Sequence, residues 1–177
     1  MQPHRKALFC LLLLLSSISA FALESDRSKP LKVQANKASL NKTTGISTYS
    51  GNVIVKQGSL EIRAHQLKVY TKGGKLQKMI AHGTPVTFQQ RPDHKQQNIT
   101  AKAQKMTFNA INNVTIFEQQ AELRQGDNAF NSNHIIYNLK NDTVVAGKQN
   151  GGGRVTITIQ PDKPASKTHN KLKNVTE

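Results

Sequence analysis

A short pattern of apolar and small residues recurs four times along the chain. It reads apolar, any, small, any, any, apolar, any, apolar, and its copies begin at Val33, Ile62, Ala101 and Phe130. Alternating segments lie between and after these copies, at residues 51–55, 83–88, 120–123 and 153–159. Alternation with a period of two puts apolar side chains on one face of a strand. The pattern therefore predicts repeated strand pairs, each burying its apolar face on the next.

Each copy also contains a step of three residues between a small residue and the next apolar one. The steps are Ala35 to Ala38, Ala64 to Leu67, Ala103 to Met106 and Ser132 to Ile135. A step of three breaks the period of two, which predicts a bulge or bend at the same place in every repeat. Such a bend would turn each strand from one sheet into another, as in a sandwich or jelly roll.

Turn-forming residues separate the strand-like segments. They cluster at 41–45, 72–75, 112–113 and 140–142, where Gly, Asn and Asp tolerate a positive φ or bond to nearby backbone. After residue 22 no stretch has a convincing helical period, and Leu23–Lys29 has room for one helical turn. The predicted fold class is all-β, with at most that short N-terminal helical turn.

The first 22 residues have the features of a cleaved signal peptide. Arg5 and Lys6 precede an apolar run from Ala7 to Ala22, and Ala20-Phe21-Ala22 fits a small-x-small cleavage site. The alternative is a membrane anchor, but a span needs roughly 20 apolar residues. We predict a signal peptide at 1–22, one β domain at 23–160 and a disordered basic tail at 161–177, which is too polar to bury much surface.

The charge of the chain is strongly positive. Cleavage would remove Arg5 and Lys6 from its 25 basic residues and leave all 10 acidic ones, a net charge of +13. This charge favours an anionic partner: nucleic acid, a phosphorylated lipid or an acidic glycan. Export makes nucleic acid the least expected of the three, so we predict no nucleic-acid partner. The lone cysteine, Cys10, lies in the signal segment, so the exported domain has no disulfide.

Motifs of enzyme chemistry are absent from the sequence. There is no Gly-x-Ser-x-Gly elbow and no glycine-rich loop placed to hold phosphates. The histidines have no metal-ligand spacing, and the acidic residues are scattered rather than paired. We therefore predict a protein that is not an enzyme, with no catalytic residues, cofactor or metal.

The chain resembles the OstA-like domain family, that of the lipopolysaccharide-transport periplasmic protein LptA. The most specific stretch is Gly51-Asn52-Val53-Ile54-Val55-Lys56-Gln57-Gly58. The likeness extends to residues 30–33, 49–50, 62–64, 83–88, 103–108 and 153–156. Two positions depart from the family pattern: Phe108 stands where many members have tyrosine, and Gln119-Gln120 where a Gly-Asn turn is common.

The resemblance implies an open, twisted β-jelly roll in the periplasm. Members of the family stack end to end and carry lipopolysaccharide from the inner to the outer membrane, with its acyl chains shielded in a groove. The implied partners are lipopolysaccharide with its lipid A, LptC at the inner membrane, the N-terminal domain of LptD at the outer membrane, and further copies in a head-to-tail homo-oligomer.

The resemblance also implies which residues carry these contacts. The lipid-binding groove would contain Leu31, Val33, Phe88, Met106 and Phe108. The first strand and the last would both have an open edge, which favours pairing with another chain. The predicted assembly edges are Leu31, Val33, Val155, Ile157 and Ile159.

Two other functions fit the residues alone. A scaffold assembled through its strand edges would have a dry interior and no bound lipid. A binder of acidic glycan would use the basic outer face, and its affinity would fall steeply with salt.

Overall fold

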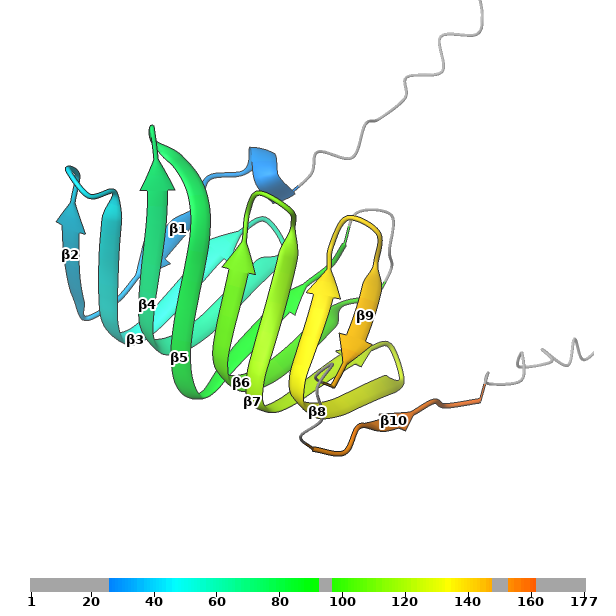
Figure 1. Cartoon of the computed structure of the whole chain (residues 1–177). Helices are drawn as coiled ribbons and strands as arrows, with labels where there is room; N and C mark the ends of the chain where they lie inside the picture. The colour runs from blue at the N-terminus through cyan, green and yellow to red at the C-terminus, as the bar shows by residue number, and fades with distance from the viewer. Residues whose placement is uncertain (1–25, 93–96, 148–152, 162–177) are drawn as a thin grey trace, which may run out of the picture.

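The computed structural model describes residues 26–92, 97–147 and 153–161 (Figure 1). A 3₁₀ turn, η2, comes first at Asp26–Ser28, within the segment expected to hold one helical turn. The strands are β1 (Lys32–Gln34), β2 (Lys37–Asn41), β3 (Ile46–Gln57), β4 (Leu60–Lys72), β5 (Lys75–Gln90), β6 (Ile99–Asn109), β7 (Val114–Gln125), β8 (Asn128–Asn138), β9 (Thr143–Ala146) and β10 (Thr156–Thr158). The predicted signal peptide and residues 162–177 of the predicted tail lie outside the described residues.

All the strands belong to one open antiparallel sheet. Its order is β1-β3-β4-β5-β6-β7-β8-β10, with β2 also paired to β3 and β9 also paired to β8. The central strands β3 to β8 are long, from 11 to 16 residues, and each bends in its middle (Figure 1). The predicted all-β fold of repeated strand pairs is therefore confirmed. The two sheets expected from the bends are two layers of one continuous sheet.

The bends line up across the sheet and form a corner. Between neighbouring strands the register shifts at Ser50/Val53, Arg63/Gln66, His82/Val86, Lys102/Lys105 and Glu118/Ala121. The three-residue steps in β4, β6 and β8 fall at this corner, so the predicted recurring bend is confirmed. In the first copy the chain breaks into two strands, β1 and β2, and Asn36 N donates to Gly51 O at 2.9 Å between them.

The corner divides the sheet into two layers. Layer A contains β2, β9 and residues 46–50, 66–72, 75–82, 105–109, 114–118 and 134–138. Layer B contains β1, β10 and residues 53–57, 60–63, 86–90, 99–102, 121–125 and 128–132. Each layer therefore ends in its own short strand, β2 and β9 in layer A, β1 and β10 in layer B.

The core lies between the layers and consists of rows of paired residues. In layer B one row crosses every strand: Val33, Val55, Ile62, Phe88, Ala101, Leu123, Phe130 and Ile157. In layer A a facing row runs Ala38, Tyr49, Leu67, Ala81, Met106, Phe117, Ile135 and Ala146. The middle members of both rows are buried. Burying each large apolar side chain stabilises the fold by roughly 1.5–3 kcal/mol.

Candidate functional site

The five predicted groove residues all belong to the space between the layers. Val33 in β1 and Phe88 in β5 lie in the inner row of layer B. Met106 and Phe108 in β6 lie on the inner face of layer A, paired with Ala81 and Met79. Leu31 packs against the same core just before β1. Residues far apart in the sequence are thus brought to one interior.

The middle of this interior is filled by side chains from both layers. Met106 is fully buried and Phe88 is 4% exposed. The ring of Phe88 in layer B meets that of Phe117 in layer A edge to face, with centroids 5.5 Å apart and planes at 67°. Such a pair contributes about 0.5–1.5 kcal/mol beyond the area it buries. It holds the two layers together at their centre.

The apolar rows continue to both ends of the sheet, where they become accessible. Leu40 in β2 is 62% exposed and Ile157 in β10 is 53% exposed, although both continue inward-facing rows. Val33 and Leu31, near the β1 edge, are only partly buried. The interior is therefore closed in the middle and presents apolar side chains at each end.

The predicted edge residues lie on the two end strands of layer B. Leu31 and Val33 are at β1, while Val155, Ile157 and Ile159 are exposed in or beside β10. The structure adds the end strands of layer A, β2 and β9, which the predicted edges did not include. Every residue of β2 is exposed. The β-branched run Thr143-Val144-Val145, directly after a turn, is the sequence signal that would have found β9.

A carboxylate joins the two layers at one end of the interior. Asp142, in the turn between β8 and β9, accepts hydrogen bonds from Tyr137 Oη in layer A and Gln125 Nε2 in layer B, both at 3.2 Å. Burial raises the pKa of Tyr137 well above its ordinary value, and the charge of Asp142 adds to the rise. Sequence reasoning missed this contact.

A second aspartate fixes the N-terminal turn to layer B. Asp26 Oδ1 accepts a hydrogen bond from Ser59 N at 2.7 Å, and Asp26 Oδ2 accepts one from Gln90 Nε2 at 3.2 Å. Because Ser59 precedes β4 and Gln90 ends β5, η2 is held against the free ends of these strands. This orients the chain that leads into β1.

Two inward-facing residues of β7 were absent from the predicted groove. Phe117 contacts Phe88, and Thr115 is completely buried between Phe108 and Tyr137 in the second inner row of layer A. Sequence periodicity could not have found them, because Val114 and Ile116 on the opposite face are apolar as well.

Among the described residues no group of three or more His, Cys, Asp and Glu side chains is placed to hold a metal ion. In the same part of the chain no helix has the length and apolar character needed to cross a membrane.

The chain matches the model of a known protein family. The family is described as "LptA/(LptD N-terminal domain) LPS transport protein", and its model matches residues 32–143. The matched segment begins at β1 and ends at the first residue of β9, so it covers most of both layers.

Relatives of similar length share about a third of their residues with the chain. The lipopolysaccharide export system protein LptA of Haemophilus influenzae is 34% identical, with 88% of this chain and 91% of that protein covered. LptH of Pseudomonas aeruginosa and LptA of Escherichia coli K12, both also named lipopolysaccharide export system proteins, are 30% identical. The first match covers 89% of this chain and 94% of that protein, the second 89% and 85%.

A solved structure has the same architecture. The crystal structure of LptH from Pseudomonas aeruginosa matches with a TM-score of 0.73 and 26% sequence identity, covering 78% of this chain and all of that one. LptH is described there as the LptA-homologous periplasmic component of the conserved lipopolysaccharide transport device.

Proposed function

Because the chain belongs to the LptA/(LptD N-terminal domain) family of lipopolysaccharide transport proteins, we propose that it is a bridge subunit carrying lipopolysaccharide from the inner to the outer membrane. The observation that carries this proposal is the inner apolar row of layer B, which crosses every strand from Val33 to Ile157 without interruption. A continuous apolar track is what an acyl chain needs in order to pass along a protein without meeting water.

The acyl chains lie between the layers, against Leu31, Val33, Phe88, Met106 and Phe108. Each methylene group taken out of water contributes about 0.8 kcal/mol, so a few chains bind strongly. Since the middle of the interior is packed, loading must separate the layers there, and the contact between Phe88 and Phe117 is the one that parts. Phe108 is partly buried and so is reached before the fully buried Met106.

Copies of the chain assemble end to end. The β10 edge of one copy, with Val155, Ile157 and Ile159, pairs with the β1 edge of the next, with Leu31 and Val33. This contact joins different surfaces and does not close on itself, so it generates a filament. It also continues the inner row from Ile157 of one copy to Val33 of the next.

The same edges serve the two membrane partners, LptC at the inner membrane and the N-terminal domain of LptD at the outer membrane. The family description, which includes the LptD N-terminal domain, supports a partner with a similar strand edge. The site of action is the periplasm. The signal peptide predicted at 1–22 and the description of LptH as a periplasmic component support this location.

The test is a photo-crosslinking amino acid placed at Phe108 in cells, with the product probed by an antibody to lipopolysaccharide. We expect a shifted, lipopolysaccharide-positive band. The matched control places the same amino acid at His65, an exposed position at the corner of β4, where no such band should form. Absence of the band at Phe108, with crosslinks between copies still forming at Ile157, would instead indicate a scaffold with a dry interior.

A substitution provides a second arm of the test. Phe108→Glu puts a carboxylate on the inner face of layer A, where it repels acyl chains. We expect lipid loading to be lost while the circular dichroism spectrum of the sheet is kept. Unchanged loading of the Phe108→Glu variant would count against transport through the interior.

A further inference from the structure

The outer face of layer B, which points away from the interior, contains a hollow of about 350 Å³. Its lining residues come from β4, β5, β6 and β7, the four central strands of the layer. Sites for small molecules occupy about 300–1,000 Å³, so this hollow is large enough for one. The space between the layers is on the other side of the sheet, so the hollow is separate from the proposed lipid groove.

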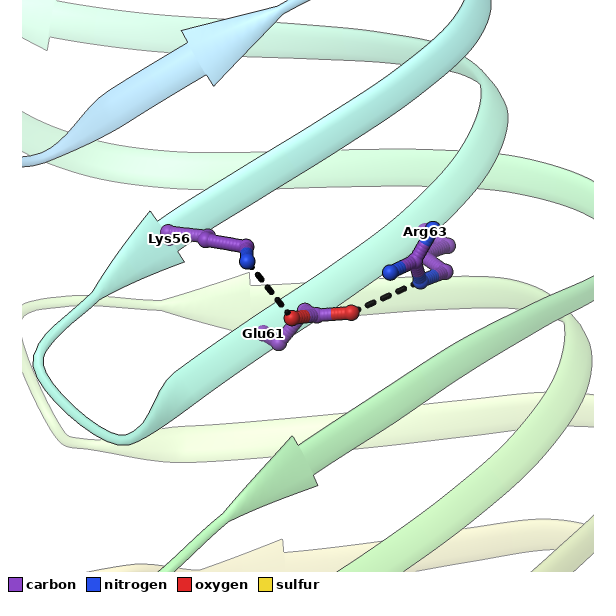
Figure 2. Close-up of polar contacts among 3 residues, drawn as sticks. All are labelled: Lys56, Glu61 and Arg63. Atoms are coloured by element: carbon purple, nitrogen blue, oxygen red, sulfur yellow. Dashed lines mark hydrogen bonds and ion pairs between the residues drawn. The ribbon is translucent and has the colours of Figure 1, made fainter.

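Two arginines on opposite sides of this hollow are each held by a glutamate. Figure 2 shows Glu61 between Lys56 and Arg63. Arg63 Nε donates to Glu61 Oε1 at 2.7 Å, and Lys56 Nζ lies 3.2 Å from Glu61 Oε2. Arg124 Nε pairs with Glu122 Oε1 in the same way on β7. A guanidinium group has five N–H donors, and the contact with glutamate uses that of Nε. The two glutamates therefore position the arginines and leave donors that can face a ligand.

The contacts around Glu61 keep its carboxylate charged. The hydrogen bond from Lys56 lowers the pKa of Glu61 below its ordinary value, and the contact with Arg63 lowers it further. Glu61 is ionised at neutral pH, as an ordinary glutamate is, and its contacts with both cations extend this to more acidic pH. Arg63 and Arg124 themselves remain accessible, with side chains 57% and 61% exposed.

Neutral polar side chains and one further lysine lie between the two arginines. In one outer row Arg63 is followed across the strands by Thr87 and Lys102, and in the next row Gln89 and Thr100 precede Arg124. Strands lie about 4.8 Å apart, so three strand spacings separate β4 from β7 by roughly 14 Å, and the two arginines are at least that far apart along the backbone. Lys102 forms no ion pair with any residue that the structure describes. The hollow therefore has a surplus of positive charge.

We propose that this hollow binds an acidic saccharide, a sugar that carries a phosphate or carboxylate group. Arg124 and Lys102, on neighbouring strands, supply charge-assisted hydrogen bonds to the anionic group, and Arg63 on the far side of the hollow donates to sugar hydroxyl groups. The hydroxyl groups of Thr87 and Thr100 and the amide of Gln89 both donate and accept, which suits the hydroxyl groups of a sugar ring. The carboxylates of Glu61 and Glu122 accept hydrogen bonds from further sugar hydroxyls.

The hollow is reached from the free ends of layer B. Glu61 is the second residue of β4, and Arg124 is the last but one of β7. A glycan leaving the space between the layers at these ends would therefore pass beside the hollow. The assignment of the ligand to the glycan of the carried lipid rests on the proposed function. The saccharide site itself does not, because a free acidic saccharide presents the same chemistry.

The experiment is a titration of the ¹⁵N-labelled chain, residues 23–177, followed by the amide signals of β5 and β6. The probes are glucose 6-phosphate, glucose and inorganic phosphate. We expect saturable shifts at Thr87, Thr100 and Lys102 with glucose 6-phosphate, and affinities at least tenfold lower for the other two probes. Inorganic phosphate binding as tightly as glucose 6-phosphate would overturn the assignment of a saccharide, and no saturable shift would overturn the site.

Matched variants separate this site from general attraction to a basic protein. Arg124→Gln removes one guanidinium from the hollow and should weaken binding of glucose 6-phosphate about tenfold. Lys68→Gln removes the same charge from an exposed position on the outer face of layer A and should leave the affinity unchanged. Equal weakening by both variants would show that only net charge matters and would overturn the proposal.

Two further arms keep the proposed function and this inference apart. If glucose 6-phosphate binds but Phe108 never crosslinks to lipopolysaccharide, the site stands and the transport function fails. If Phe108 crosslinks and no saccharide binds, only the inference fails. Competition by deacylated lipopolysaccharide would assign the site to the glycan of the carried lipid, whereas its failure to compete would assign it to a free acidic saccharide.

Discussion

Two hydroxyl groups lie side by side on the inner face of layer A in different surroundings. Thr115 and Tyr137 face each other across β7 and β8, and both are completely buried. Tyr137 Oη donates to Asp142, whereas Thr115 Oγ1 has no hydrogen-bond partner among the described residues. A buried hydroxyl without a partner costs about 1–3 kcal/mol. The hydroxyl of Thr115 is therefore a buried polar group that destabilises the fold.

Replacing Thr115 by valine should stabilise the protein. Thr115→Val keeps the shape of the side chain and removes the unpaired hydroxyl, so the free energy of unfolding in urea should rise by about 1 kcal/mol. Thr107→Val on the outer face of layer A is the control, and its effect should stay within roughly 0.5 kcal/mol. A loss of stability in Thr115→Val would mean that the hydroxyl has a partner in solution.

The buried tyrosine predicts a loss of stability at alkaline pH. Because the pKa of Tyr137 is raised in the folded state, its contribution to stability is fully present below the unfolded pKa of about 10. It is lost as the pH rises from there toward the folded pKa, since the unfolded chain then releases the proton first. Between pH 9 and 11 the wild type should lose about 1.4 kcal/mol more than Tyr137→Phe.

Urea unfolding at these two pH values measures the difference. Thr107→Val on the outer face of layer A, which changes no titrating group, is the control and should keep the pH dependence of the wild type. An identical pH dependence in Tyr137→Phe and wild type would contradict the prediction.

At the scale of single residues the sequence predicts which face a side chain occupies but not its polar partner. Alternation placed Phe88, Met106 and Phe108 toward the interior. It could not choose the inward face of residues 114–117, because both faces of that segment include apolar side chains. The contact of Gln125 with Asp142 could not be read in this way. It depends on the paths of two turns that approach only after the sheet has bent.

The position of the corner is set by the pairing of whole strands rather than by the conformational preference of the residues at each bend. In β3 the bend has positive φ at Gly51 (76°) and Asn52 (48°), residues suited to that conformation. In β7 Gln119 (66°) and Gln120 (53°) adopt it at the corresponding bend. Glutamine in the left-handed region costs roughly 1–2 kcal/mol per residue. β7 thus keeps the turn geometry although it departs from the family's Gly-Asn pattern. The strand pairing on either side of Gln119 and Gln120 fixes where β7 must bend.

Restoring the favoured residues in β7 should relieve this strain. The double substitution Gln119→Gly and Gln120→Asn should raise the free energy of unfolding by about 1–2 kcal/mol. Gln66→Gly tests the opposite case, because Gln66 lies at the same corner in β4 without a positive φ. That control should lose roughly 0.5–1 kcal/mol. Destabilisation by both changes would show that the β7 bend is not strained.

Elements with a clear apolar alternation were predicted, and those with polar inward positions were not. The layer B halves of β3, β5 and β7 match the predicted segments. The layer A half of β3 was missed because Ser47 lies in an inward row and Tyr49 is flanked by Thr48 and Ser50. The short β9 was missed because four residues are too few to show a period. The tertiary pairing of β9 with β8 decides that it is a strand.

On the scale of the whole molecule, the two ends of the sheet expose apolar side chains, whereas the middle buries them. An isolated strand edge with apolar side chains is normally blunted, because it invites pairing with another chain. Here Leu40 at one end and Ile157 at the other are exposed, and they continue rows that are buried in the centre. A second copy at each end would bury these side chains as the neighbouring strands bury the middle ones. Each end of the molecule therefore exposes part of an apolar row whose middle members are buried.

A charge placed at the exposed end of an inner apolar row should block assembly without unfolding the domain. Ile157→Lys puts an ammonium group in the inner row at the β10 edge, where joining a second copy would take it out of water. Self-association, measured by sedimentation over a range of concentrations, should weaken about tenfold. Ile111→Lys places the same charge in the exposed turn between β6 and β7, away from both edges, and should associate like the wild type. If the two variants weaken association equally, repulsion between basic copies explains the effect. If Ile157→Lys alone weakens it, the inner row itself must continue from one copy into the next.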